Sequence, residues 1–231
     1  MSAEISIVIP TLDAEADLPH CLQALMEGLP AGLIRELIVS DGGSSDGTRR
    51  IAEAAGAVLV TGPASRGGQL RRGCAIARGR WLLVLHADTV LEPGWARVVA
   101  DHIARPGAGA ACFRLGFRAR GLMPAWVAGW ANLRASRFGL PYGDQGLLVP
   151  VAAYRRAGGY PDQPLMEDVA LVRALTRTEA ARPALLALRA LTSAERYRRD
   201  GWLRRGARNL WTLARYALGA DPERLAAAYR R

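Results

Sequence analysis

Short apolar runs alternate with helical patterns over the first hundred residues of the chain. The runs that read as buried strands are Ile5–Ile9, Glu36–Ser40, Ala57–Thr61 and Trp81–Leu85. Between them apolar residues recur at the spacing of a helix, as at Leu18, Leu22, Leu25 and Leu29. Nearly continuous apolar strands that are separated by helices predict an α/β fold, with a central, mostly parallel sheet flanked by helices.

The alternation becomes less regular after about residue 106. Further strands are predicted at Ala110–Phe117 and Gln145–Val149, and further helices at Trp126–Phe138 and Glu167–Leu175. From Trp202 onward the pattern is that of an amphipathic helix, whose apolar face we expect to pack on the rest of the protein. No linker or repeat divides the chain. We therefore expect a single domain over 1–231, with a nucleotide-binding half (1–106), an acceptor and catalytic half (107–200) and basic C-terminal helices (201–231).

The basic charge of the chain is carried entirely by arginine and is concentrated at the C-terminus. The formal net charge is +10 and the sequence contains no lysine. The segment from Ser193 to Arg231 contributes six of these ten charges. A basic tail of this kind fits a nucleic acid, an anionic membrane surface or a phosphorylated substrate, and composition alone does not choose among them.

Three features predict a cytoplasmic protein. The cysteines Cys21, Cys74 and Cys112 are widely spaced, as expected of free buried thiols in a reducing compartment. The first ten residues lack the basic start and apolar core of a signal peptide. No apolar run approaches the ~18 residues of a membrane-spanning helix. The expectation is a cytoplasmic location, with peripheral contact at the inner face of the membrane left open.

The residues that follow each predicted strand are the first candidates for a site, because parallel strands place their carboxyl ends along one edge of the sheet. The first strand leads into PTLDAE, which starts at Pro10 and contains no glycine. This argues against dinucleotide dehydrogenases, P-loop enzymes and sugar-phosphate nucleotidyltransferases. The second strand ends at Asp41, followed by the turn formers Gly42 and Gly43. For Asp46 and Thr48, a turn and helix cap is a sufficient explanation.

The third and fourth strands end in residues that suit a diphosphate. Arg66 and Arg71 stand near a helix start, where they can cradle phosphates or belong to a solvated surface turn. His86 and Asp88 follow the fourth strand, and they would point the same way if the strand continued through them.

Taken together, these strand ends resemble the family-2 glycosyltransferases, whose nucleotide-sugar-binding fold is called GT-A. The matching segments are SIVIPTLDAE, ELIVSDGGSSDGT, SRGGQLRRGCAIARGRWLLVLHADT, GDQGLLV and MEDVAL. In particular, the chain resembles the small soluble bacterial group named radical-SAM/selenodomain-associated transferase 2. The resemblance extends to about residue 200.

The resemblance implies a nucleotide-diphosphate sugar as donor, with UDP- or GDP-sugars favoured. The residues that would bind this donor are Pro10, Thr11, Asp13, Glu15, Asp41, Gly43, Arg66, Gly67, Gln69, Arg71, His86, Ala87 and Asp88. Among them, Asp41 would accept a hydrogen bond from the base, and Arg66 would lie near the diphosphate.

A divalent metal, Mn²⁺ or Mg²⁺, is also implied. Asp88 matches the last carboxylate of the family's Asp-x-Asp metal motif. The first carboxylate of that motif is replaced by His86, which can bind a metal, donate a hydrogen bond to a phosphate or fill space. A hard cation keeps several waters and takes phosphate oxygens as ligands, so one protein carboxylate suffices in principle.

Catalysis is expected from the pair Glu167 and Asp168, which matches the Glu-Asp pair of inverting members. Asp168 is the expected general base for the acceptor hydroxyl, and Glu167 its support. The alternative is two acids favourably placed in a first helical turn. The segment Gly143, Asp144 and Gln145 matches the one that lines the acceptor and donor-sugar side.

The acceptor itself is not identified by the sequence. Trp126 and Trp130 lie one helical turn apart, and they form either an acceptor platform for a lipid-linked or apolar molecule or part of the core. The Gln-x-x-Arg-Trp signature of processive synthases is missing, so a non-processive inverting transferase is expected. The rival function is a basic protein that binds nucleic acid or an anionic surface. Charge alone would not require the ordered strand-end residues, and we expect no nucleic-acid partner.

Overall fold

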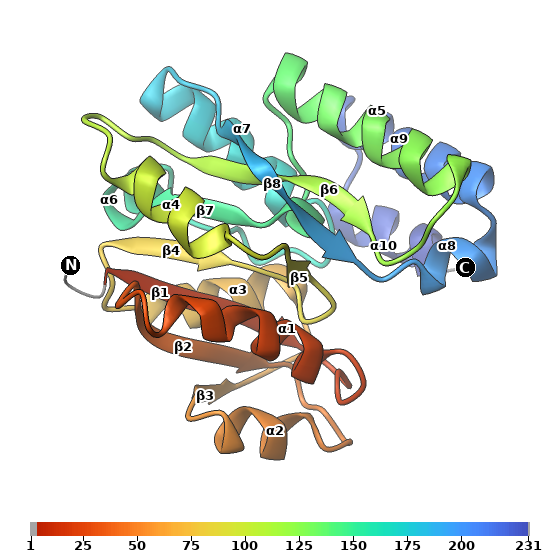
Figure 1. The fold of residues 1–231 in the computed structure, drawn as a ribbon. Coiled ribbons are helices and arrows are strands. Elements are labelled where there is room, and N and C mark those ends of the chain that lie inside the picture. Colours follow the sequence, from red (N-terminus) through yellow and green to blue (C-terminus); the bar gives the residue numbers. More distant parts are fainter. Residues whose placement is uncertain (1–3, 231) are drawn as a thin grey trace.

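The computed structural model describes residues 4–230 of the chain (Figure 1). Within these residues, eight strands form one sheet in the order β3-β2-β1-β4-β7-β6-β8-β5. The strands are β1 (Ile5–Thr11), β2 (Ile34–Asp41), β3 (Val58–Thr61), β4 (Trp81–Val84), β5 (Val90–Leu91), β6 (Ala111–Phe117), β7 (Leu147–Pro150) and β8 (Ala184–Thr192). The ends of the expected domain, residues 1–3 and 231, lie outside the described residues.

The sheet is parallel over its first half and mixed beyond it. β3, β2, β1 and β4 pair in parallel, and β6 pairs in parallel with β8. β7 runs antiparallel to both β4 and β6, and β5 runs antiparallel to β8. The α/β fold with a central, mostly parallel sheet is confirmed. Of the two strands that run against the others, β7 lies in the half whose alternation is less regular and β5 lies before it.

Helices cover both faces of the sheet (Figure 1). Their bounds are α1 (Leu18–Leu25), α2 (Thr48–Ala54), α3 (Arg66–Ala75), α4 (Trp95–Ile103), α5 (Leu122–Phe138), α6 (Val151–Arg156), α7 (Glu167–Glu179), α8 (Glu195–Asp200), α9 (Trp202–Ala217) and α10 (Pro222–Arg230), with short 3-10 helices η1 (Met26–Gly28) and η2 (Gly143–Gln145). α1, α2 and α4 contribute to one core, and α3, α6 and α7 to the core on the opposite face. In residues 4–230 no helix has the length and apolar character needed to cross a bilayer.

The side chains of β1 point alternately to the two faces of the sheet, and both faces are covered. Ile5, Ile7 and Ile9 belong to the core with α1 and α4, whereas Val8 belongs to the core with α3 and α7. All four side chains are fully buried. Successive residues of a strand point to opposite faces, so an unbroken apolar run is what a strand covered on both sides requires.

Strand β8 was not anticipated, although it is the longest strand described. Its sequence, ALLALRALT, consists largely of alanine, leucine and arginine, which favour helices. Pairing with β6 along most of its length and with β5 at its end overrides this local preference.

The expected packing of the amphipathic helix α9 is wrong. Its apolar side chains Leu203, Leu210 and Trp211 are exposed, whereas Arg205 and Thr212 are buried. The polar side of α9 thus faces the protein. The three cysteines are free and buried, as expected, and burial raises the pKa of each thiol to about 12.

Candidate active site

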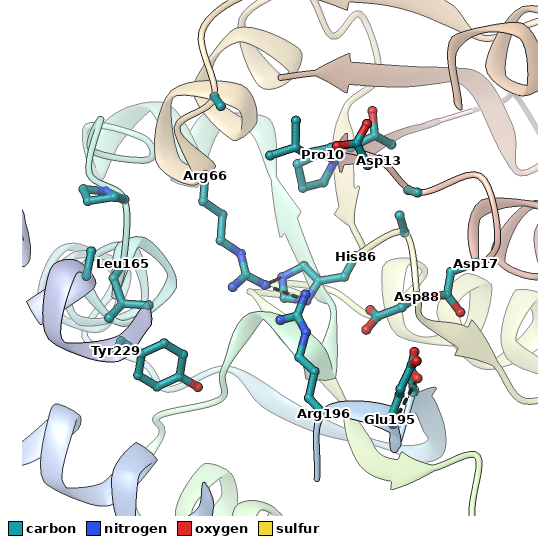
Figure 2. A pocket seen from close by; sticks show the side chains of 18 of the residues that line it. Pro10, Asp13, Asp17, Arg66, His86, Asp88, Leu165, Glu195, Arg196 and Tyr229 are labelled. Atoms are coloured by element: carbon teal, nitrogen blue, oxygen red, sulfur yellow. Dashed lines mark hydrogen bonds between the residues drawn. The ribbon is translucent and has the colours of Figure 1, made fainter. Parts of the chain in front are cut away.

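Two connected cavities lie at the carboxyl ends of the first-half strands. The larger has a volume of about 920 Å³ and the smaller about 130 Å³. Both are lined by Arg66, His86 and Asp88, so these residues stand where the two cavities meet. Figure 2 shows Arg66 and His86 extending toward one another, with Asp88 close by on the loop after β4. In the register of the sheet, Thr11 at the end of β1 is paired with Asp41 at the end of β2.

His86 and Asp88 reach the site from a turn and not from a strand. β4 ends at Val84, and the N–H of Thr89 donates to the carbonyl of His86 at 3.1 Å. The same-face argument for a strand therefore does not apply, although both residues still line the cavities. The Asp88 carboxylate accepts a hydrogen bond from the Thr192 hydroxyl at 3.3 Å.

Arg66 connects the loop after β4 with the start of α7. It is the first residue of α3, directly after Ser65, whose hydroxyl accepts from the N–H of Gly68. The Arg66 Nη2 lies 2.9 Å from Nδ1 and 2.7 Å from Nε2 of His86, and its Nε lies 3.1 Å from Oε1 of Glu167. Burial, reinforced by the positive charges of Arg66 and Arg196, holds the pKa of His86 well below its ordinary value. A neutral imidazole results, which is the form that binds metals.

The start of α7 holds both expected catalytic acids, and they point to different partners. Met166 just before the helix has a φ of +63°, which is uncommon for a residue other than glycine. Glu167 is 2% exposed and pairs with Arg66. Burial raises its pKa; the Arg66 charge opposes this shift and Asp168 reinforces it. Asp168 lines the smaller cavity, and its Oδ2 accepts from the N–H of Gly143 at 2.6 Å.

Segment η2 packs closely against these residues. A Cβ on Gly143 would lie 2.5 Å from Nε2 of His86, so only glycine fits here without displacing the ring. Asp144 lines the smaller cavity, and its Oδ1 is buried without a hydrogen-bond partner. Burial raises the pKa of Asp144 to about 6; Arg134 opposes this shift and Asp168 reinforces it. Gln145 is fully buried and donates to the Phe113 carbonyl, a structural contact.

Asp41, the expected partner of the base, is turned into the protein. It is fully buried and absent from the lining of both cavities. Its carboxylate accepts hydrogen bonds from the side chains of Thr11, Ser44 and Arg49 and from the N–H groups of Gly43 and Ser44. Burial alone would raise its pKa, but these hydrogen bonds outweigh it and lower the pKa to about 2. In this structure Asp41 organises the turn.

The other expected donor-binding residues divide into two groups. Those that line the larger cavity are Pro10, Thr11, Asp13, Gln69 and Ala87. Those that do not are Glu15, Gly43, Gly67 and Arg71. Glu15 instead accepts from the N–H of Gly47, and Gly67 packs against the carbonyl of Pro161, which a Cβ would approach to 2.1 Å.

Trp126 and Trp130 are not brought to the site. Both are exposed on α5 and line neither cavity. The buried side of α5, including Val127 and Ala131, packs against Leu115 of β6. These two tryptophans therefore belong neither to the core nor to the wall of the cavities described here.

The C-terminal arginines were not assigned to the site by sequence, but they form much of its wall. Those that line the larger cavity are Arg196, Arg199, Arg204, Arg205 and Arg208. Figure 2 shows Arg196 directed toward His86, with Tyr229 of α10 on the same side of the cavity. The sequence contained one indication of this, the positive net charge of the segment from Ser193 to Arg231. The position of these arginines on the wall of the cavity is compatible with a phosphorylated ligand, one of the three readings of the sequence.

The donor set around Asp88 is compatible with one hard cation. Within residues 4–230, no group of three or more His, Cys, Asp or Glu side chains is arranged as a metal site. Asp88 offers a carboxylate to both cavities, and the buried Oδ1 of Asp144 lacks a partner. A cation held in this way would need oxygens from a bound ligand and water, which is usual for Mg²⁺ bound with phosphates.

Comparison with known proteins agrees with this arrangement. The curated relatives that match include a "PGL/p-HBAD biosynthesis glycosyltransferase" of Mycobacterium bovis, 36% identical over 110 residues. The match covers 45% of this chain and 40% of the relative, so the aligned region is less than half of either protein.

Solved structures share the fold at lower identity. Glucosyl-3-phosphoglycerate synthase from Mycobacterium tuberculosis, in complex with Mn²⁺, UDP and glucosyl-3-phosphoglycerate, superposes with a TM-score of 0.58 at 23% identity, covering 82% of this chain and 70% of that one. The mannosyltransferase PcManGT from Pyrobaculum calidifontis, in complex with GDP-Man and Mn²⁺, superposes with a TM-score of 0.61 at 16% identity, covering 83% of this chain and 57% of that one.

The sequence profile of the family described as "Glycosyl transferase family 2" matches residues 6–151, which is more than half of the chain. The match includes β1 to β4, the start of α3 and the segment around Gly143. It thus contains Arg66, His86 and Asp88, which line both cavities. The chain belongs to glycosyl transferase family 2.

Proposed function

We propose that this protein is an inverting, non-processive glycosyltransferase, which moves a sugar from a nucleotide-diphosphate sugar to an acceptor hydroxyl. The observation that carries the proposal is the junction of the two cavities. There Arg66, a neutral His86 and the Asp88 carboxylate line both cavities, and a second carboxylate, Asp168, lines the smaller cavity. A larger cavity for a nucleotide opens on one side of this junction, and a smaller one for the reacting groups on the other.

The diphosphate of the donor would lie against the arginines of the larger cavity. Arg196, Arg204 and Arg208 line it, and none of the salt bridges described for residues 4–230 involves them. Their charge is thus not neutralised by a nearby carboxylate. Guanidinium groups bind phosphate oxygens through directed, charge-assisted hydrogen bonds, and they stabilise the negative charge that grows as the diphosphate leaves.

Asp168 is the proposed general base. Its Oδ2 is fixed by the Gly143 N–H, and the carboxylate faces the smaller cavity, where an acceptor hydroxyl would approach. The acceptor oxygen would form a bond to the anomeric carbon while the bond from that carbon to the diphosphate oxygen breaks on the opposite side. The hydroxyl proton passes to Asp168, and the configuration of the anomeric carbon is inverted.

Glu167 is the proposed support for this arrangement. It holds Arg66, and Arg66 in turn contacts His86, so this ion pair positions both Arg66 and His86. A divalent ion at Asp88, with His86 as second candidate ligand, would neutralise charge on the leaving diphosphate when bound. The same-fold relatives in complex with Mn²⁺ support this assignment.

The proposal is tested with a thermal-shift screen of UDP-, GDP- and dTDP-sugars in the presence of Mn²⁺ or Mg²⁺. One donor should raise the melting temperature in a metal-dependent manner, and Asp88→Asn should abolish the metal-dependent part. Asp101→Asn, at an exposed position of α4, is the matched control and should respond as the parent protein does. Absence of a shift with every donor would contradict the proposal. NMR of the product formed with the active donor would then establish whether the anomeric configuration is inverted.

A further inference from the structure

Helix α9 exposes a continuous apolar stripe to solvent. The stripe consists of Leu203, Ala207, Leu210, Trp211, Ala214, Ala217 and Leu218, all of which are exposed. At about 100° per residue these positions fall within a sector of roughly 120°. Leu203 is 64% exposed, Trp211 67% and Leu218 88%. Apolar residues in such a pattern normally face a core, so an exposed stripe of this length indicates a missing partner.

The remaining sides of α9 hold it to the protein through polar contacts and through the ring of Trp202, which packs on Phe117 and Tyr197. Arg205 is buried and pairs with Asp200 at 2.6 Å, and Asn209 bonds to Tyr197 and Tyr229. Arg204 and Arg208 line the larger cavity. On the helical wheel Arg204, Arg208 and Arg215 border one edge of the apolar stripe, within about 40° of each other. The helix thus separates a basic cavity wall from an apolar outer surface.

Helix α5, which contacts α9, carries an exposed apolar stripe of its own. Its exposed apolar residues Leu122, Trp126, Trp130 and Leu133 are spaced by three or four positions, so they share one side of the helix. α5 and α9 contact each other, and Figure 1 shows them next to one another, with α5 over β6. We call the eight large residues the α5–α9 face: Leu122, Trp126, Trp130, Leu133, Leu203, Leu210, Trp211 and Leu218.

We propose that the α5–α9 face docks on the surface of an anionic lipid bilayer. The two helices carry six arginines and no aspartate or glutamate; Arg134 and Arg205 are buried, and the other four are at least partly exposed. Exposed tryptophans and leucines with arginines at their border are the composition of helices that lie in a membrane interface, where the apolar side enters the lipid and the cations meet the head groups. Tryptophan suits this depth in particular, because one end of the ring is apolar and the other polar.

Charge argues against a second copy of the chain as the partner. In a two-fold dimer the same surface meets itself, so the four arginines of α5 and α9 that are at least partly exposed would approach those of the other copy. Neither helix supplies a carboxylate to pair with them. Anionic lipid removes this repulsion, because each arginine near the surface then gains a favourable interaction.

Docking in this way would set the cavity beside the membrane. Arg204 and Arg208 lie between the stripe of α9 and the larger cavity, so the site and the lipid would be separated by the thickness of one helix. This inference does not depend on the proposed sugar transfer, since it rests on the surface alone. Membrane docking without transferase activity, or the reverse, would separate the two proposals.

The test is flotation of the full chain with vesicles of phosphatidylcholine alone or of phosphatidylcholine with phosphatidylglycerol. The parent protein should float with the anionic vesicles, less with the neutral ones, and less again at high salt. The variant Leu203→Gln/Trp211→Gln/Leu218→Gln should lose roughly tenfold or more in partition coefficient. The variant Trp126→Gln/Trp130→Gln measures, in the same assay, how much α5 contributes to the partition coefficient.

A matched control carries the same kind of change on another surface. Met26→Gln/Leu29→Gln/Ile76→Gln replaces three exposed apolar residues of the first half, and it should float as the parent does. Melting curves check that every variant folds. If the triple variant does not fold, the single variant Leu218→Gln, at the end of α9, takes its place in the flotation test. Failure of the parent to float, or equal flotation of parent and α9 variant, would overturn the proposal. So would sedimentation of the parent as a dimer that the α9 variant converts to a monomer, because the face would then bind a second copy.

Discussion

The guanidinium of Arg66 lies 3.1 Å from the buried carboxylate of Glu167, and thereby connects the first turn of α3 with the first turn of α7. The same guanidinium touches the ring of His86. Two elements from different halves of the chain are thus fixed at the junction of the cavities by a single ion pair. Removal of either partner should affect both the stability of the protein and the geometry of the site.

Arg66→Ala should destabilise the protein by about 1–3 kcal/mol, because it leaves a buried carboxylate without its counter-charge. This expected loss in the free energy of unfolding is smaller than for a fully buried ion pair, because the Arg66 side chain is partly exposed. Glu167→Gln in the Arg66→Ala background should recover part of the loss. Urea unfolding measures both, and Arg71→Ala on the exposed side of the same helix is the control. Equal stabilities of Arg66→Ala and Arg71→Ala would contradict this interpretation.

Asp168→Asn should lower the turnover of the active donor by roughly 100-fold or more, because the amide cannot accept the proton of the attacking hydroxyl. The side-chain oxygen of asparagine can still accept from the Gly143 N–H, so the fold and the donor affinity should be retained. Release of nucleoside diphosphate reports turnover, and calorimetry reports donor affinity. A variant that loses donor binding and turnover to the same extent would show that Asp168 binds the donor instead.

The strand-end residues were predictable because the rule that governs them is general. Parallel strands place their carboxyl ends on one edge, so the positions of Thr11, Arg66 and Asp88 follow from the order of strands and helices. What sequence could not supply was the direction of each side chain. Asp41 stands at the expected strand end, yet five hydrogen bonds turn it into the protein.

The C-terminal half of the site was beyond sequence reasoning for a different reason. Arg196, Arg204 and Arg208 reach the cavity through the packing of α8, α9 and α10. Amphipathic periodicity reveals that α9 has two sides, but not which of them faces the protein. The usual assumption that the apolar side of such a helix is buried does not hold for α9. The expectation that its apolar face packs on the rest of the protein is therefore wrong.

His86→Asp should shift the metal preference toward Mg²⁺ without abolishing donor binding, because a carboxylate is a harder ligand than imidazole. The new carboxylate would also lie beside the Arg66 guanidinium, which now contacts the His86 ring. The donor-induced thermal shift, measured in Mn²⁺ and in Mg²⁺, reports the preference. His86→Asn provides the uncharged control. If both variants keep the preference of the parent protein, His86 does not act on the metal.

Asp144→Asn should remove part of the pH dependence of stability. Burial, opposed by Arg134 and reinforced by Asp168, raises the pKa of Asp144 to about 6 in the folded protein, from 3.8 when unperturbed. The folded state then binds more protons than the unfolded state between these two values. Its contribution to stability is therefore present in full below the lower pKa and is lost as the pH rises through about 6.

Asparagine resembles the protonated carboxyl at every pH, so the variant and the parent should be close in stability near pH 4, and the variant should be more stable near pH 8. A gap on the order of 1–3 kcal/mol is expected to open over this range. Glu167, whose pKa is also raised, is present in both proteins, so the comparison isolates Asp144. Urea unfolding without ligand at several pH values measures the gap. A difference that stays constant with pH would contradict this prediction, because Asp144 would then not titrate in this range.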